Sequence, residues 1–267
     1  MRLIPPPLAL ALLSLLPIPA LAATTPPGVN LRWDNCYDDG GTQNKTFACD
    51  TNTGSERLVL SFVLAAPLAD VGGVAIYVEV VSASATLPSW WQFFNPGTCG
   101  QASLAITAAP PATSVHCADW ASGFASANIA GYDIGYVGTN SASVLVANAV
   151  DASHYAVLDP NVEYSAGSLL IKHAKTVGLG SCAGCDVPVC LVIQRLGVFT
   201  STSQNNVYLL TGANGPASQV ATWQDAAALD LHTATFMSEP RVLIGSCVLA
   251  STPTRGSTWG AVKSLYR

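Results

Sequence analysis

Three cysteines lie close together in the segment Gly180-Ser-Cys-Ala-Gly-Cys-Asp-Val-Pro-Val-Cys190. Their thiolates could bind zinc with His173, or the Cys182-x-x-Cys185 pair could carry out thiol–disulfide exchange. The second paired motif of a zinc ribbon is missing, and a redox motif should begin a helix, whereas Pro188 and an apolar strand pattern follow here. We therefore interpret Cys182, Cys185 and Cys190 as structural disulfide cysteines.

All eight cysteines follow the first 35 residues, and their even number predicts four disulfides in an oxidising compartment. The short spacings predict the local bridges Cys36–Cys49 and Cys99–Cys117. One cysteine of the cluster is then expected to bind Cys247 and fix the last strand, while the other two pair locally. The spacing does not decide which of the three reaches Cys247, and we prefer Cys182.

An acidic, Asn- and Gly-containing stretch precedes the first long apolar run and could bind calcium. Carboxylate and amide oxygens at alternate positions are typical of loops that bind hard cations. The glutamate at position twelve of an EF-hand is missing, and Asx and Gly turns form from the same residue types without a cation. The candidate ligands are Asp34, Asp38, Asp39, Asp50, Asn52 and Glu56.

Aromatic residues between Leu87 and Gly100 could stack against a sugar, and Trp90 and Trp91 are the candidate ligand-binding residues. Neighbouring side chains of a strand face opposite sides, so the two indoles cannot share one flat surface. Large aromatic side chains mostly fill cores. We favour a core position for this group, with one tryptophan exposed as the alternative.

Recognisable catalytic motifs are missing from the sequence. It contains no Gly-x-Ser-x-Gly, no His-Glu-x-x-His and no Gly-x-x-x-x-Gly-Lys. The histidines, His116, His154, His173 and His232, are scattered along the chain. A hydrolase site assembled by folding from distant residues is the remaining enzymatic hypothesis.

The first 22 residues predict a secretory signal peptide. Arg2 precedes the apolar run Leu8–Leu16, and the small residues of Ala20-Leu21-Ala22 form a cleavage site. Elsewhere the apolar runs are shorter than the ~18 residues that a membrane helix requires. We expect a secreted, extracellular or cell-surface protein without a membrane span.

Charged residues make up only 10% of the chain, and the formal net charge is −5. A usual soluble protein has about 25% charged residues. A weakly charged acidic surface disfavours nucleic acid or an anionic membrane as partner.

Short apolar runs separated by Gly, Asn, Asp and Pro predict about ten strands without helical alternation. We therefore expect an all-β protein, an antiparallel β-sandwich of jelly-roll type over 23–250, in which 23–30 is a linker. The predicted strands are 58–64, 74–81, 129–137, 144–150, 163–171, 189–198, 207–210, 219–223 and 241–247.

Two segments near the C-terminus have helical patterns, 225–231 and the tail 251–267. In the tail, Trp259, Val262, Leu265 and Tyr266 share one helical face, and Lys263 and Arg267 are favourable near a helix C-terminus. We expect this basic tail to mediate self-association or to contact a surface glycan or an export or surface apparatus.

The ending Thr-Trp-Gly-x-Val-Lys-x-Leu-Tyr-Arg and the Gly-Ser-Cys-Ala-Gly-Cys-x-x-Pro-Val-Cys segment resemble a group of uncharacterised exported bacterial proteins. The resemblance covers about a tenth of the chain and implies export and a shared architecture. No activity follows from it.

These observations predict a secreted or cell-surface structural or adhesive protein that is not an enzyme. A carbohydrate-binding module with a calcium-supported loop is the first alternative, and a secreted hydrolase is the second. No cofactor is expected apart from the calcium hypothesis.

Overall fold

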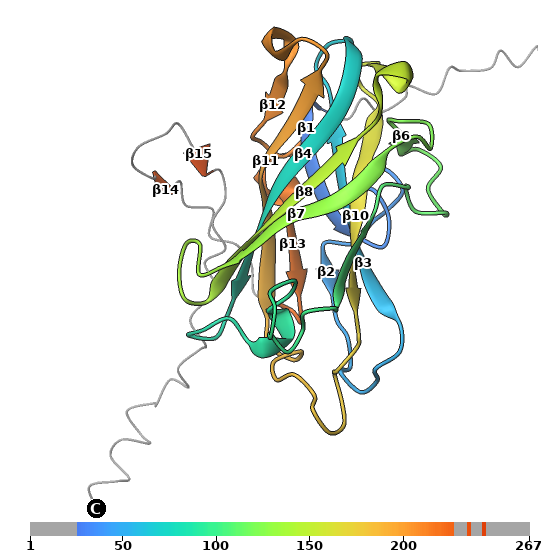
Figure 1. The fold of residues 1–267 in the computed structure, drawn as a ribbon. Helices are drawn as coiled ribbons and strands as arrows, with labels where there is room; N and C mark the ends of the chain where they lie inside the picture. Colours follow the sequence, from blue (N-terminus) through green and yellow to red (C-terminus); the bar gives the residue numbers. More distant parts are fainter. Residues whose placement is uncertain (1–25, 227–233, 236–241, 244–267) are drawn as a thin grey trace, which may run out of the picture.

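The computed structural model describes residues 26–226, 234–235 and 242–243 (Figure 1). The strands between residues 28 and 223 form two packed β-sheets. The predicted all-β, sandwich-like class is confirmed. Strands run up and down along the long axis, so the loops gather at the two ends of the sandwich. Residues distant in sequence therefore meet at each end.

The five-stranded sheet has the order β1-β3-β10-β5, and β6 pairs with β10 in parallel. Its strands are β1 (Gly28–Trp33), β3 (Ser55–Val63), β5 (Leu104–Thr107), β6 (Ala118–Asp119) and β10 (Glu163–Lys172).

The eight-stranded sheet has the order β2-β13-β11-β4-β8-β7, with β12 also paired to β11 and β9 to β4. Its strands are β2 (Asn44–Lys45), β4 (Leu68–Ser82), β7 (Ser126–Ile134), β8 (Ser141–Ala149), β9 (Ala156–Leu158), β11 (Val189–Thr200), β12 (Val207–Leu209) and β13 (Val220–Trp223). A separate two-stranded pair is formed by β14 (Ala234–Thr235) and β15 (Val242–Leu243).

Alternating apolar residues build the core, because successive side chains of a strand point to opposite faces. Val74, Ile76, Val78 and Val80 of β4 are all buried and belong to one large cluster between the sheets. The same cluster contains Trp33, Trp90, Trp91 and Trp223.

Eight of the nine predicted strands coincide with described strands; of the ninth, 241–247, the described part is β15. The linker prediction for 23–30 was wrong at its end, since β1 begins at Gly28. Val29, Leu31 and Trp33 are buried there, a short alternation that the prolines at 26 and 27 obscured. The predicted signal peptide and tail helix lie outside the described residues, as does most of the 225–231 segment.

The described helices are 3-10 turns of three or four residues: η1 (Ser89–Trp91), η2 (Ala152–His154), η3 (Ser203–Asn205) and η4 (Pro216–Gln219). Among the described residues, no helix has the length and apolar character needed to cross a membrane.

Three disulfides join Cys36 to Cys117, Cys49 to Cys185 and Cys99 to Cys182, across 81, 136 and 83 positions of sequence. Cys190 is disulfide-bonded too. The predicted pairs Cys36–Cys49 and Cys99–Cys117 were therefore wrong, and so was the local pair within the cluster.

The preferred Cys182–Cys247 bridge was also wrong, because Cys182 binds Cys99. Cys247 itself lies outside the described residues. Proximity along the chain misled the prediction, since the sandwich brings the loops of distant strands together at one end. A protein with several disulfides indicates an oxidising environment such as the cell exterior.

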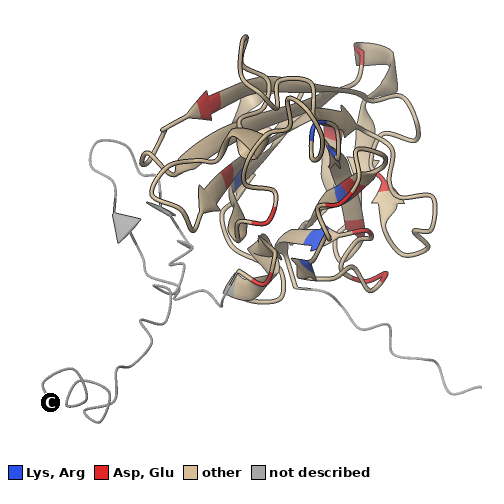
Figure 2. Ribbon diagram, turned by 90° about the horizontal axis from the view of Figure 1, so that it is seen from below, with Lys and Arg blue, Asp and Glu red and all other residues tan. Residues whose placement is uncertain are grey.

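Charged residues are sparse and scattered on both sheets (Figure 2). No single-sign band of charge dominates the described ribbon in this view, in agreement with the low charged fraction of 10%.

Candidate functional site

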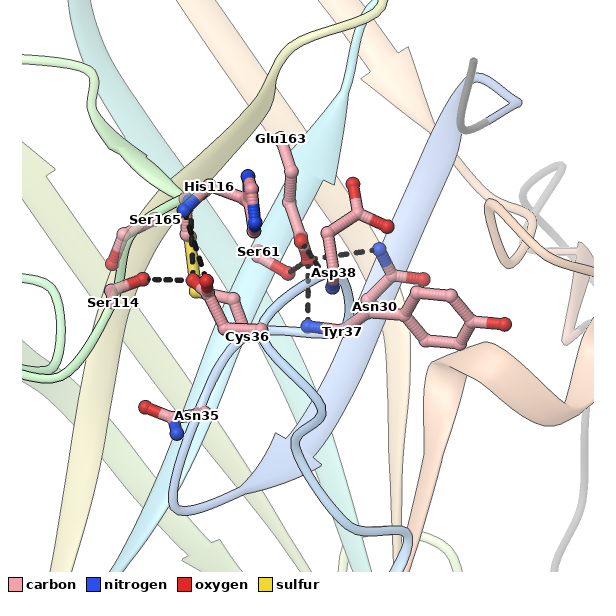
Figure 3. The surroundings of a disulfide bond; sticks show 12 residues. Asn30, Asn35, Cys36, Tyr37, Asp38, Ser61, Ser114, His116, Glu163 and Ser165 are labelled. Carbon is pink, nitrogen blue, oxygen red and sulfur yellow. Dashed lines mark hydrogen bonds between the residues drawn. A yellow bond between two sulfur atoms is a disulfide. The ribbon is translucent and has the colours of Figure 1, made fainter. Parts of the chain in front are cut away.

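A polar cluster surrounds the Cys36–Cys117 disulfide on the outer side of the smaller sheet (Figure 3). The buried carboxylate of Glu163, on β10, accepts hydrogen bonds from the Tyr37 amide at 3.1 Å and the Asp38 amide at 2.9 Å. It also accepts from Asn30 Nδ2 at 3.1 Å and from the Ser61 hydroxyl. Glu163 thus fastens the turn that follows Cys36 onto the sheet.

Within the described part of the chain, one trio of His, Cys, Asp or Glu side chains brings its ligand atoms within 4.8 Å of one another: Cys36, Cys117 and Glu163. A cysteine binds zinc only as a thiolate. The two sulfur atoms are bonded to each other, so this trio is a structural fastening and not a metal centre.

Asp39 holds the loop that carries the second cysteine of this bridge. Its carboxylate accepts hydrogen bonds from the Ser114 hydroxyl and from the amides of Val115 at 3.0 Å, His116 at 2.9 Å and Cys117 at 3.2 Å. Burial alone would raise the pKa of Asp39, but these four donors outweigh it and lower the pKa. The carboxylate is therefore used as a loop clamp.

An ionic group of Lys45, Asp34, Glu56 and His173 links the acidic stretch to the residue that follows β10. Lys45 Nζ lies 2.9 Å from Asp34 Oδ1 and 2.7 Å from Glu56 Oε2. Burial by itself lowers the pKa of Lys45, but its hydrogen bonds to Glu56 and Asp34 outweigh this effect and raise it. Glu56 also meets His173 Nε2 at 3.0 Å.

The imidazole of His173 is buried and fixed on three sides. Its Nδ1 lies 2.7 Å from the carbonyl oxygen of Thr53, and its ring stacks on Phe47 with 3.8 Å between centroids. A carbonyl oxygen only accepts hydrogen bonds, so Nδ1 carries a proton. These contacts place His173 in the ionic group. The cysteines with which zinc binding was considered are in disulfides and provide no thiolate.

The six candidate calcium ligands do not form one cluster. Asp34 and Glu56 bind Lys45, and Asp39 binds the 114–117 loop. Asn52 Oδ1 accepts hydrogen bonds from the backbone amides of Thr176 at 2.7 Å and Val177 at 2.9 Å. Asp38 and Asp50 are exposed, and the backbone amide of Asp38 binds Glu163. Four of the six predicted calcium ligands thus use their side-chain oxygens in structural contacts.

Both candidate sugar-stacking residues are in the core. Trp90 is 1% exposed and Trp91 is fully buried, which confirms the favoured core position and excludes the exposed alternative for either side chain. They lie in η1 rather than in a strand, and both contact Trp223, with centroid distances of 5.5 and 5.6 Å. Their role is packing at one end of the sandwich.

An exposed Asp–Ser–His group occurs at η2 but lacks the geometry of a catalytic triad. Asp151 Oδ1 and the Ser153 hydroxyl both approach His154 Nδ1, at 3.0 and 3.1 Å. In a triad the acid and the nucleophile bind different ring nitrogens. The hydrogen bonds lower the pKa of Asp151 to about 2, as expected for a carboxylate that caps a turn.

The segment 173–188 between β10 and β11 is held more firmly than a usual surface loop, and we call it the clamped loop. Its cysteines Cys182 and Cys185 are bonded to Cys99 and Cys49. Asn52 donates from Nδ2 to the Val177 carbonyl at 3.0 Å, in addition to accepting two amides of this loop. Few degrees of freedom remain at its base.

The tip of the clamped loop presents apolar groups to solvent. Leu179, between two glycines with φ of +88° and +80°, is fully exposed at 109% relative accessibility, and Val177 is 37% exposed. The base is closed by the Cys182 amide, which donates to the Lys175 carbonyl at 2.7 Å. The buried Trp90 Nε1 donates to the Thr176 hydroxyl at 3.0 Å. A core residue and two disulfides therefore hold the base of a loop whose tip exposes an apolar side chain to water.

Sequence reasoning missed Leu179, Glu163 and the loop contacts of Asp39. The Gly178-Leu179-Gly180 triplet is a usable signal, because an apolar residue between two glycines has no strand or helix to bury it. Glu163 carries no such signal, since its partners come from β1, β3 and the 36–38 turn.

A scan against protein-family models and a search of curated proteins found no match to this chain. The functional proposal therefore depends on the geometry described above.

Proposed function

We propose that this protein is a non-enzymatic structural or adhesive protein of the cell exterior, which makes contact with a surface protein through the tip of the clamped loop. The observation that carries this proposal is the fully exposed Leu179 on a loop with two disulfides at its base. Isolated exposed apolar residues are common on proteins. Here, however, two disulfides fix the base of the loop that carries the residue.

An apolar tip on a fixed base is suited to binding, because the base of the loop has little conformational entropy to lose when the tip is covered. Residues that are fully buried in a well-packed pocket of the partner contribute most of the binding energy at a protein interface. Val177, two residues before Leu179, is also exposed and would widen the contact. An apolar pocket on another surface protein is therefore the partner that this tip fits.

The side chains that could take part in catalysis or metal binding support the same proposal, because they form hydrogen bonds or ion pairs that hold loops in place. Glu163 and Asp39 accept hydrogen bonds from backbone amides of the 36–38 turn and the 114–117 loop. Glu56 is paired with Lys45 and His173. Export through the 1–22 segment, a jelly-roll connectivity and relatedness to exported bacterial proteins belong to this proposal and are consistent with the oxidised cysteines.

Leu179→Ser tests the proposal in producing cells. The protein retained on the cell surface and that released into the medium are quantified for the wild type and the variant. The matched control is Val115→Ser, which changes an 82% exposed apolar residue on the other disulfide-tied loop. We expect release of Leu179→Ser, with Val115→Ser retained as the wild type. Equal retention of all three chains would contradict the proposal.

A further inference from the structure

Three residues of the larger sheet are buried on its outer face, away from the core between the sheets. Leu191 and Ile193 of β11 belong to the core cluster. Because successive side chains of a strand point to opposite faces, Cys190 and Val192 point outward, and so does Val220 of β13, which pairs with Val192. These three residues form a cluster separate from the core, which we call the outer patch.

The outer patch is covered as completely as the core. Val192 and Val220 are 0% exposed, and Cys190 is 2% exposed. Glu79 of β4 pairs with Val192, and Thr222 of β13 pairs with Cys190, and both neighbours are buried as well. The uncovered face of an antiparallel sheet is in contact with water. Another segment must therefore lie over this patch.

The described elements do not provide this cover. Those in main contact with β11 and β13 are their neighbours in the sheet, β1 on the core side, and the turns η3 and η4. η3 lies between β11 and β12, and η4 directly precedes β13. The Ser218 hydroxyl of η4 donates to the Val29 carbonyl of β1 at 3.1 Å, which holds this turn against the smaller sheet.

The cysteines identify the segment that lies over the patch. Cys190 is disulfide-bonded, and the other six described cysteines are bonded to one another. Cys247 is the eighth cysteine of the chain and is the partner left for Cys190 within one molecule. A disulfide holds its two Cα atoms about 4.4–6.8 Å apart. A Cys190–Cys247 bridge thus brings residue 247 onto the outer patch.

The chain that leads to Cys247 begins beside the patch and is long enough to return to it. β13 ends at Trp223, one residue after the partner of Cys190. The antiparallel pairing of β14 with β15 turns the chain back before it reaches Cys247. Residues 227–246 would span on the order of 70 Å when fully extended, which leaves ample length for this path.

We propose that residues 244–250, which lie outside the described residues, cover the outer patch as an extended segment that a Cys190–Cys247 disulfide fastens to β11. An apolar patch requires an apolar cover, because the burial of apolar surface is what stabilises such a contact. The apolar residues on the two sides of Cys247 are Ile244, Val248, Leu249 and Ala250. The outer patch is thus the docking site of this chain's own C-terminal segment.

The disulfide also sets which side chains of the segment face the sheet. Alternate residues of an extended chain share one side. With Cys247 directed toward Cys190, Leu249 faces the sheet and covers the two valines of the patch. Val248 is directed away from the sheet and provides the matched control.

Carbene footprinting of the purified full-length chain, read out by mass spectrometry, tests the cover. Peptides that contain Val192 and Val220 should be labelled weakly in the wild type and in Val248→Asp. In Leu249→Asp their labelling should rise several-fold, because an aspartate does not remain on an apolar patch. Labelling of the core strand β3 should stay low in all three chains, which shows that the fold is retained. Equal labelling of the patch in Leu249→Asp and Val248→Asp would overturn the proposal.

The wild-type sequence with a diazirine amino acid at position 249 gives a readout that does not depend on the aspartate variants. Irradiation should cross-link position 249 to β11 or β13 of the same chain. A cross-link between two copies, or patch labelling of the wild type that rises on dilution, would assign the cover to a second copy and overturn the proposal. A cross-link to a different part of the chain would overturn it too.

Discussion

Asn148, on β8 of the larger sheet, donates from Nδ2 to the carbonyl oxygen of Ala166, on β10 of the smaller sheet. Both residues are buried, so this hydrogen bond joins the two sheets through the core. It depends on the register shift of β10 between Ser165 and Ser168, which turns the backbone toward the opposite sheet.

Gly167 makes this contact possible, and Gly167→Ala should destabilise the fold by about 1–3 kcal/mol. Its φ is +106°, and an added Cβ would lie 2.9 Å from Asn148 Nδ2 and 3.0 Å from the Thr107 carbonyl oxygen. Gly97→Ala is the control, because φ is +82° there but the space is open. Urea unfolding of both variants checks this; an equal loss in both would show that the close approach does not matter.

Disulfide mapping should recover the long-range bridges. Digestion without reduction, followed by mass spectrometry, is expected to give peptides that link Cys36 with Cys117, Cys49 with Cys185, and Cys99 with Cys182. By elimination among eight cysteines, Cys190 is expected to be linked to Cys247. A Cys36–Cys49 or Cys99–Cys117 peptide as the major species would contradict the fold at both ends of the sandwich.

Glu79 should reduce stability at neutral pH. Burial raises its pKa above the ordinary value of 4.5, although the hydrogen bond from Gln194 lowers it in part. A raised carboxyl pKa means that the folded state binds the proton more tightly, so its ionisation costs stability above the folded pKa and nothing below the unfolded one.

Glu79→Gln should therefore increase the free energy of unfolding at neutral pH, on the order of 1 kcal/mol. The gain should disappear below about pH 4. Chemical denaturation of both chains at the two pH values measures it. A gain that persists in acid would assign the effect to packing instead.

Calcium and EDTA should leave the melting midpoint unchanged. The oxygens of Asp34, Asp39 and Glu56 already meet a lysine or backbone amides, and Asn52 holds the clamped loop. Differential scanning calorimetry with each additive tests this. A midpoint that rises with Ca²⁺ and falls with EDTA would restore the calcium hypothesis.

The fold class was predictable because strand alternation is a local property. Val74 to Val80 alternates visibly in the sequence, and the sandwich follows from many such runs. β1 was missed because its six residues follow two prolines, and β5 because it has only four residues. Short strands are stabilised by their neighbours rather than by their own pattern.

The disulfide pairing and the roles of the acids could not be predicted, because they depend on which loops meet in space. Cys49 and Cys185 are separated by 136 positions and share one end of the sandwich. The residues of the acidic stretch were predicted to bind one ion, yet they point to different loops. Leu179 was within reach of prediction from its flanking glycines, but its rigid support was not.

Site-specific photo-cross-linking at Leu179 tests the central claim most directly. A benzophenone amino acid is placed at this position, or at Val115 as the control, and intact producing cells are irradiated. We predict a discrete cross-linked product with a surface protein from position 179 and none from position 115. Lack of a product at 179, or the same product from both positions, would contradict contact through the clamped loop.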